Sequence, residues 1–123
     1  MIKFVIHGPV KGGKNNMLMT RTGRHYPNPA WAAWRDGILA QLGTQLRIEG
    51  FQETYTNPCI MTVEYWPSDK RRRDVPAMID SIFHILEKAH IIADDCLIED
   101  VSWTFRQYDK MNGRAEIEIR EKL

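Results

Sequence analysis

The sequence predicts a single α+β domain in which two helices pack on one face of a mixed sheet. Strand-like alternation and helix-like periodicity interleave along the chain in the order β-α-β-α-β-β. The length of 123 residues fits one domain with a real core. No linker, internal repeat or low-complexity tract divides residues 1–123. We therefore expect one sheet and one hydrophobic core.

The first half of the chain predicts a strand, a long loop and a helix. Residues 2–7 alternate, as in an edge or half-buried strand. The basic stretch "GPVKGGKNNMLMTRTGRHYPNP" that follows predicts a loop, and loops of this length are usually functional or mobile. Asn28 as N-cap and Pro29 at the first position start a helix that ends at Gly50. Its expected buried stripe is Trp31, Trp34, Ile38, Leu42 and Leu46.

The second half predicts a strand, a helix and two further strands. "CIMTVEYW" alternates as a strand, and residues 76–89 form a second amphipathic helix. "CLIEDVSWTFRQY" and "RAEIEIRE" alternate as two strands, and "MNGR" between them is compatible with a type I′ hairpin turn. The apolar stripe expected for the second helix is Met78, Ile79, Ile82, Phe83 and Leu86.

The composition excludes several classes of protein. A hydrophobic fraction of 43% and a net charge of +1 describe an ordinary globular chain rather than a polycation, so nucleic-acid binding would need a local patch. Cys59 and Cys96 lack metal-ligand spacing, which fits a reducing cytoplasm. The opening run is too short for a signal peptide, and no stretch is long enough to span a membrane.

The stretch "GPVKGGKN" nearly matches the P-loop pattern of nucleotide hydrolases. Gly8, Gly13 and Lys14 are in place, but Asn15 stands where the magnesium-binding hydroxyl belongs. The residues after Lys14 are also a poor helix start. We therefore expect no nucleotide cofactor and interpret the segment as a basic loop that touches a phosphate backbone.

The segment "KRRRDVPAMID" concentrates charge at the start of the second helix. Four cations, Lys70 to Arg73, precede Asp74, and Asp80 lies on the first turns. The helix is about 21 Å long, and the extended segment "HIIADD" reaches about 20 Å. The chain can therefore return and bring Asp94 or Asp95 to the helix start, beside the other two carboxylates.

Each carboxylate also has a structural interpretation. Asp74 can be an ordinary N-cap, Asp80 a solvated residue that faces His84, and the aspartate pair a turn before a strand. If three carboxylates do converge, their mutual repulsion calls for a cation, and oxygen-rich sites suit Mg²⁺ or Mn²⁺. Cations beside such a site favour a phosphodiester substrate.

The sequence resembles the RusA family of Holliday-junction resolvases, small endonucleases of prophage origin. The similarity covers nearly the whole chain and is most specific in "RRRDVPAMIDSIFHILEKAHIIADDCLI". Asn15 and Asn16, followed by "GRHYPNPAWAAWRD", lie where the family has an asparagine-bearing loop before its first helix. The resemblance implies a magnesium site built from aspartates, the first matching Asp74 and the last Asp95.

Two positions depart from the family pattern. Pro76 stands where the family has its second aspartate, and Asp80 stands where it has a lysine. Because these positions are one helical turn apart on one face, Asp80 can supply the missing carboxylate. The lysine's role would then be left empty, or be filled by Lys70, Lys11 or Lys14 from nearby loops. The other possibility is a degenerate site.

The resemblance and the charges together predict a magnesium-dependent endonuclease that resolves four-way DNA junctions by paired nicks, in DNA recombination and repair. Asp74, Asp80 and Asp95 would be the catalytic metal ligands. The predicted DNA-binding residues are Lys70, Arg71, Arg72, Arg73, Lys11, Lys14, Asn15 and Asn16. Two equivalent strands must be nicked, so we expect a homodimer. The alternative is a catalytically degenerate protein that only binds branched DNA.

Overall fold

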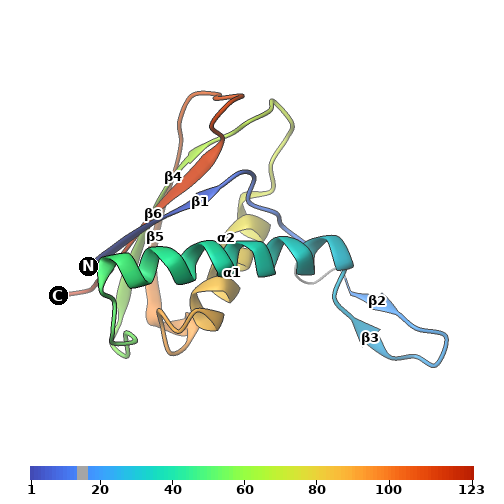
Figure 1. The fold of residues 1–123 in the computed structure, drawn as a ribbon, viewed down its shortest axis with the longest axis horizontal. Coiled ribbons are helices and arrows are strands. Elements are labelled where there is room, and N and C mark those ends of the chain that lie inside the picture. Colours follow the sequence, from blue (N-terminus) through green and yellow to red (C-terminus); the bar gives the residue numbers. More distant parts are fainter. Residues whose placement is uncertain (14–16) are drawn as a thin grey trace.

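The structure, a computed structural model, describes residues 1–13 and 17–123. A four-stranded mixed sheet carries two helices on one face (Figure 1). The strands of the sheet are β1 (Ile2–His7), β4 (Cys59–Trp66), β5 (Ile98–Phe105) and β6 (Arg114–Glu121). The remaining elements are β2 (Leu18–Met19), β3 (His25–Tyr26), the helices α1 (Pro29–Glu49) and α2 (Val75–Lys88), and the short 3₁₀ helix η1 (Asp95–Leu97). The predicted α+β class is confirmed.

The strand order is β1-β6-β4-β5, with β6 antiparallel to both β1 and β4 and β5 parallel to β4. The expected hairpin at "MNGR" is therefore wrong, because β4 lies between β5 and β6. The connection from β5 to β6 must cross two strand-to-strand distances of about 4.8 Å each. A two-residue turn is too short to do this. Residues 106–113 form the longer connection instead, and β4-α2-β5 is a parallel crossover unit.

Local signals place both helices as expected. The Asn28 side chain accepts a hydrogen bond from the Ala30 N–H, and Gly50 closes α1 in the left-handed conformation at φ 71°. In α2, Asp74 is the N-cap and Pro76 lies in the first turn. The buried Trp31 indole donates to the Ser81 hydroxyl at 3.1 Å, which ties the two helices together.

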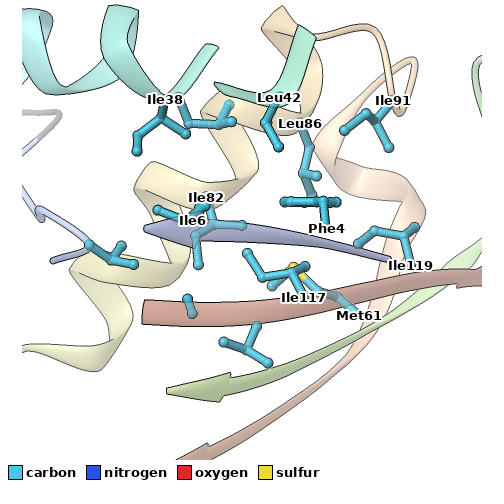
Figure 2. Close-up of a cluster of buried hydrophobic side chains, with 14 of the residues drawn as sticks. Phe4, Ile6, Ile38, Leu42, Met61, Ile82, Leu86, Ile91, Ile117 and Ile119 are labelled. Carbon is cyan, nitrogen blue, oxygen red and sulfur yellow. The ribbon is translucent and has the colours of Figure 1, made fainter. Parts of the chain in front are cut away.

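The core fills the space between the helices and the inner face of the sheet (Figure 2). Alternate residues of β1, β4 and β6 face it, and each helix adds an apolar stripe. The central side chains are Phe4, Ile6, Ile38, Leu42, Met61, Ile82, Leu86, Ile91, Ile117 and Ile119. Ile85, absent from the predicted stripe, is also fully buried. Among the described residues, no helix combines the length and the apolar character needed to cross a membrane.

A small hairpin, formed by β2 and β3, projects from the body of the protein (Figure 1). It replaces part of the loop expected over residues 8–29. Gly23, at φ 84°, and the hydrogen bond from the Thr20 N–H to the Arg24 carbonyl form its turn. Arg21 and Arg24 are exposed on it. Strands of only two residues are too short to show an alternating pattern that could be detected in a sequence.

Candidate functional site

Three loops meet at the end of the sheet where α2 begins. The loop 67–74 lies against the connection 106–113, because the Asp109 N–H donates to the Pro67 carbonyl at 2.8 Å. The loop after β1 also reaches this end: a Cβ added to Gly12 would lie 2.8 Å from the Ala77 Cβ, in the first turn of α2. The loop 67–74 leads into α2 and the loop after β1 lies against its first turn. The connection 106–113 lies beside the loop 67–74, at the top of Figure 1.

Two of these loops, 67–74 and the one after β1, carry four exposed cations that we call the basic end: Lys11, Lys70, Arg71 and Arg72. In the described part of the chain, none of their side chains forms a salt bridge with a carboxylate. The Lys70 ammonium lies 5.6 Å from the centroid of the Tyr108 ring, a cation–π contact that leaves its donors exposed. Arg72 lines a shallow surface hollow with Asp74 and Pro76. The predicted residues Lys14, Asn15 and Asn16 lie outside the described residues.

Arg73 differs from its neighbours in the basic run. Its side chain is 15% exposed, and its guanidinium donates to the Asp69 carboxylate at 2.6 Å and to the Arg71 carbonyl at 3.1 Å. The Arg71 backbone N–H and the Arg73 guanidinium together hold the pKa of Asp69 below its usual value. Arg73 therefore fixes the loop rather than presenting a charge to solvent.

Asp74 is exposed and acts as the N-cap of α2. Its carboxylate accepts a hydrogen bond from the Ala77 N–H at 3.3 Å, the geometry expected of a cap. Its place beside Arg72 matches the sequence expectation. Its separation from Asp95, the last predicted metal ligand, does not match the expectation.

The expected convergence of Asp74, Asp80 and Asp95 is not found. Asp95 lies in η1, beyond the C-terminal end of α2, and its N–H donates to the Glu87 carboxylate at 2.7 Å. Glu87 is 13 residues from Asp74, about 20 Å along the helix axis at 1.5 Å per residue. Asp80 lies between them, half-buried and about 10 Å from Glu87 by the same measure.

Two buried isoleucines explain why the chain does not return along the helix. Ile91 and Ile92 are 0% and 1% exposed, and both N–H groups donate to the Leu86 carbonyl. They hold the segment against the C-terminal turn of α2. The length of "HIIADD" permitted a return, but burying these side chains required the opposite path.

The structure instead groups three carboxylates at the C-terminal end of α2, which we call the acidic end: Glu87, Asp94 and Asp95. One oxygen from each lies within 4.8 Å of the others. The Asp94 carboxylate caps η1 by accepting a hydrogen bond from the backbone N–H of Cys96. This hydrogen bond lowers the pKa of Asp94. Sequence reasoning did not select Glu87, although its position one turn before two buried isoleucines was a usable signal.

The donor set of the acidic end fits a hard divalent cation. Three carboxylates suit Mg²⁺, Mn²⁺ or Ca²⁺. Opposite ligands of Mg²⁺ lie about 4.2 Å apart, twice its usual bond length. The three oxygens all lie within 4.8 Å of one another, a spacing that suits the ligands of a single ion.

No protein-family model matches the chain, and no curated protein matches its sequence.

Proposed function

We propose that the protein is a magnesium-dependent endonuclease that binds four-way DNA junctions and resolves them by paired nicks, as a homodimer. The observation that carries the proposal is the arrangement of charge along α2. Exposed cations surround its N-terminus, and carboxylates gather at its C-terminus. Helix dipoles favour the reverse, anions at the N-terminus and cations at the C-terminus. These two clusters therefore contribute little to the stability of the fold. They would, however, attract external ligands of opposite charge.

The basic end supports binding to a phosphate backbone. Two separate loops bring cations to the first turn of α2 in a protein whose net charge is only +1. The run from Lys70 to Arg72 leads into the helix, and Lys11 precedes Gly12, which lies against Ala77. Like charges that gather without carboxylate partners repel one another, and a polyanion relieves this repulsion. The positive end of the α2 dipole adds to the attraction. Such contacts read the backbone rather than the base sequence.

The acidic end supports metal-assisted hydrolysis. Glu87, Asp94 and Asp95 would hold Mg²⁺, or Mn²⁺ in its place. The ion would activate water and stabilise the leaving oxygen of a phosphodiester. The Asp95 N–H fixes the Glu87 carboxylate, so one ligand is already oriented. The roughly 20 Å between the two ends corresponds to about six nucleotides of one strand, at 3.4 Å each.

A second candidate is a protein on the same fold that binds branched DNA without cutting it. Asp74 and Asp80 do not join Asp95, and Pro76 occupies the position of the family's second aspartate. This separation favours a degenerate site. Cleavage distinguishes the two candidates, since both predict junction binding that weakens with salt.

The test is incubation of the protein with a labelled synthetic four-way junction, with Mg²⁺ and with a chelator. We expect symmetric nicks with Mg²⁺, binding without nicks in the chelator, and weaker binding to a linear duplex of the same sequence. Junction binding with no nicks in Mg²⁺ or Mn²⁺ would establish the binding-only protein. Failure to bind any DNA at low salt would exclude both candidates.

A further inference from the structure

The two edges of the sheet are protected very differently. At the β1 edge, the Gln45 side chain accepts from the Val5 N–H at 2.8 Å and donates to the Val5 carbonyl at 2.7 Å. Gln41 accepts from the His7 N–H at 3.2 Å. These amides from α1 occupy both outward groups of Val5 and the N–H of His7, so the second half of β1 is covered where another chain would pair.

The other edge, β5, pairs only with β4 among the described strands. The Arg106 N–H donates to the Tyr65 carbonyl, so even-numbered residues direct their backbone groups toward β4. The register is continuous from Asp100 onward, after an irregularity at the start of the strand. The N–H and C=O groups of Val101, Trp103 and Phe105 consequently point outward, along the open edge.

The same three residues form an apolar strip on the helix-bearing face of the sheet. They pair with Met61, Val63 and Tyr65, the buried residues of β4. Val101 is nevertheless 39% exposed and Phe105 48% exposed. The ring centroids of Trp103 and Phe105 are 5.9 Å apart. The strip continues the core layer past the region that the helices cover.

We propose that β5 of a second copy pairs antiparallel with this edge, about a two-fold axis that passes between the two Trp103 residues. This register matches side chains on both faces of the new ladder. On the apolar face, Val101 lies opposite Phe105 of the second copy, and the two Trp103 residues lie opposite each other. On the polar face, Asp100 lies opposite Arg106 of the second copy, and Ser102 opposite Thr104.

Charge complementarity selects a second copy as the occupant. Within each copy, Asp100 already pairs with Lys122 at 3.2 Å and Arg106 with Glu64 at 3.0 Å. Each Asp100 lies opposite Arg106 of the second copy, so these pairs join into a row of alternating charges, and no two like charges face each other directly. If the axis moves to Ser102, Asp100 faces Thr104 and Glu99 faces Phe105, so the ion pairs and the apolar match are both lost. The antiparallel arrangement also sets the connection 106–113 of each copy, beside the basic end, next to the acidic end of the other.

The proposal supplies the surface for the dimer named in the proposed function, but it does not depend on DNA cleavage. A dimer that cleaves junctions through another surface would overturn the edge pairing alone. A β5-paired dimer that never cuts DNA would overturn the nuclease alone. The two results are therefore distinguishable.

The first experiment is sedimentation velocity on the parent protein and on Phe105→Lys, with Ile48→Lys as the matched control. A lysine on an edge strand is a common natural barrier to pairing. Ile48 is an exposed apolar residue, 80% exposed on α1, away from the edge. We expect a dimer at micromolar concentration for the parent and the control, and at least a tenfold weaker dimer for Phe105→Lys. A parent that stays monomeric at 100 times that concentration, or Phe105→Lys with the parent's dimer constant, would overturn the proposal.

A second experiment tests the register and remains decisive if Phe105→Lys fails to fold. In a Cys96→Ser background, which removes the exposed native thiol, Ser102→Cys and Thr104→Cys are introduced together. Opposite residues at such a non-hydrogen-bonded position lie about 4.5 Å apart, within disulfide reach. We expect the double variant to form a disulfide-linked dimer on mild oxidation, and Ser102→Cys alone to remain uncrosslinked. Absence of crosslinking in the double variant, or equal crosslinking in the single one, would contradict the register.

Discussion

The two ends of α2 are built in opposite ways. Its first turn follows a capping aspartate and lies among exposed cations that come from two separate loops. Its last turn lies against three carboxylates, and the chain leaves it through His90, which has a positive φ of 58°. A net charge of +1 thus conceals two ends of opposite sign, about 20 Å apart.

The difference shows which charges serve the fold and which do not. Asp74 at the N-cap and Lys88 in the last turn have the signs that stabilise a helix. The clustered charges around them have the opposite signs. This contrast suggests that each end is arranged for an external ligand, a polyanion at one and a metal ion at the other.

The largest expected effect comes from the acidic end. Asp95→Asn removes a ligand charge, so we predict at least about a 100-fold slower metal-dependent cleavage of junctions, or about 2.7 kcal/mol in barrier. Junction binding in a chelator should be unchanged or tighter, because repulsion of the phosphates falls. The matched control is Asp36→Asn, an exposed aspartate on α1. Cleavage within threefold of the parent would remove Asp95 from the metal site.

The basic end should control binding rather than cleavage chemistry. Replacing Arg71 and Arg72 with alanine removes two phosphate contacts, so the slope of log affinity against log salt should fall by about two. Affinity should drop about tenfold for every sequence at physiological salt.

Arg73→Ala is the matched control for this double variant. Its guanidinium is committed to Asp69, so the salt slope should not change. Loss of these hydrogen bonds should instead lower the free energy of unfolding by about 1 kcal/mol. An unchanged slope in the double variant, or an equal fall in Arg73→Ala, would contradict the division between these arginines.

A smaller effect is expected at His90, the residue with positive φ that follows the C-terminal end of α2. His90 adopts the left-handed conformation that ends helices, and glycine tolerates it better than other residues. His90→Gly should therefore raise the free energy of unfolding by about 0.5–1 kcal/mol. The Thr54 hydroxyl bonds the His90 backbone carbonyl, so this contact survives the change. Urea unfolding measures the effect, and a destabilised variant would show that the imidazole itself matters.

The smallest effect is expected at Asp74. Asparagine caps helices as well as aspartate does, so Asp74→Asn should change stability by only a few tenths of a kcal/mol. Asp74→Ala should cost about 1 kcal/mol. Cleavage by Asp74→Asn should stay within threefold of the parent, because the carboxylate is remote from the acidic end. A large loss of cleavage with stability intact would return Asp74 to the metal site, as the family resemblance implies.

The sequence predicted those features that depend on nearby residues. The cap at Asn28, the end at Gly50 and the alternation of β4 are all local signals, and the structure confirms each. Of the two roles that the sequence allowed for Asp74, the structure shows the helix cap. Features set by distant packing were missed. The order of the strands places β4 between β5 and β6, which no turn motif reveals.

The predicted convergence of Asp74, Asp80 and Asp95 was wrong for the same reason. Chain length allowed Asp95 to reach either end of α2, and the choice was made by core space for Ile91 and Ile92. Glu87 became a candidate only once that end was known. Arg72 and Arg73 are likewise the same type of residue, so the sequence cannot distinguish them. In the structure Arg72 is exposed, whereas Arg73 is paired with Asp69.

The location of the metal is the most direct test of the contrast between the two ends. Mn²⁺ can be titrated into the ¹⁵N-labelled protein without DNA, and the broadening of each backbone amide signal followed by NMR. We predict that the strongest broadening occurs at Glu87, Asp95 and Cys96, weakens along α2, and disappears with Asp95→Asn. Strongest broadening around Asp74 and Ala77, or none that saturates, would contradict a metal site at the acidic end.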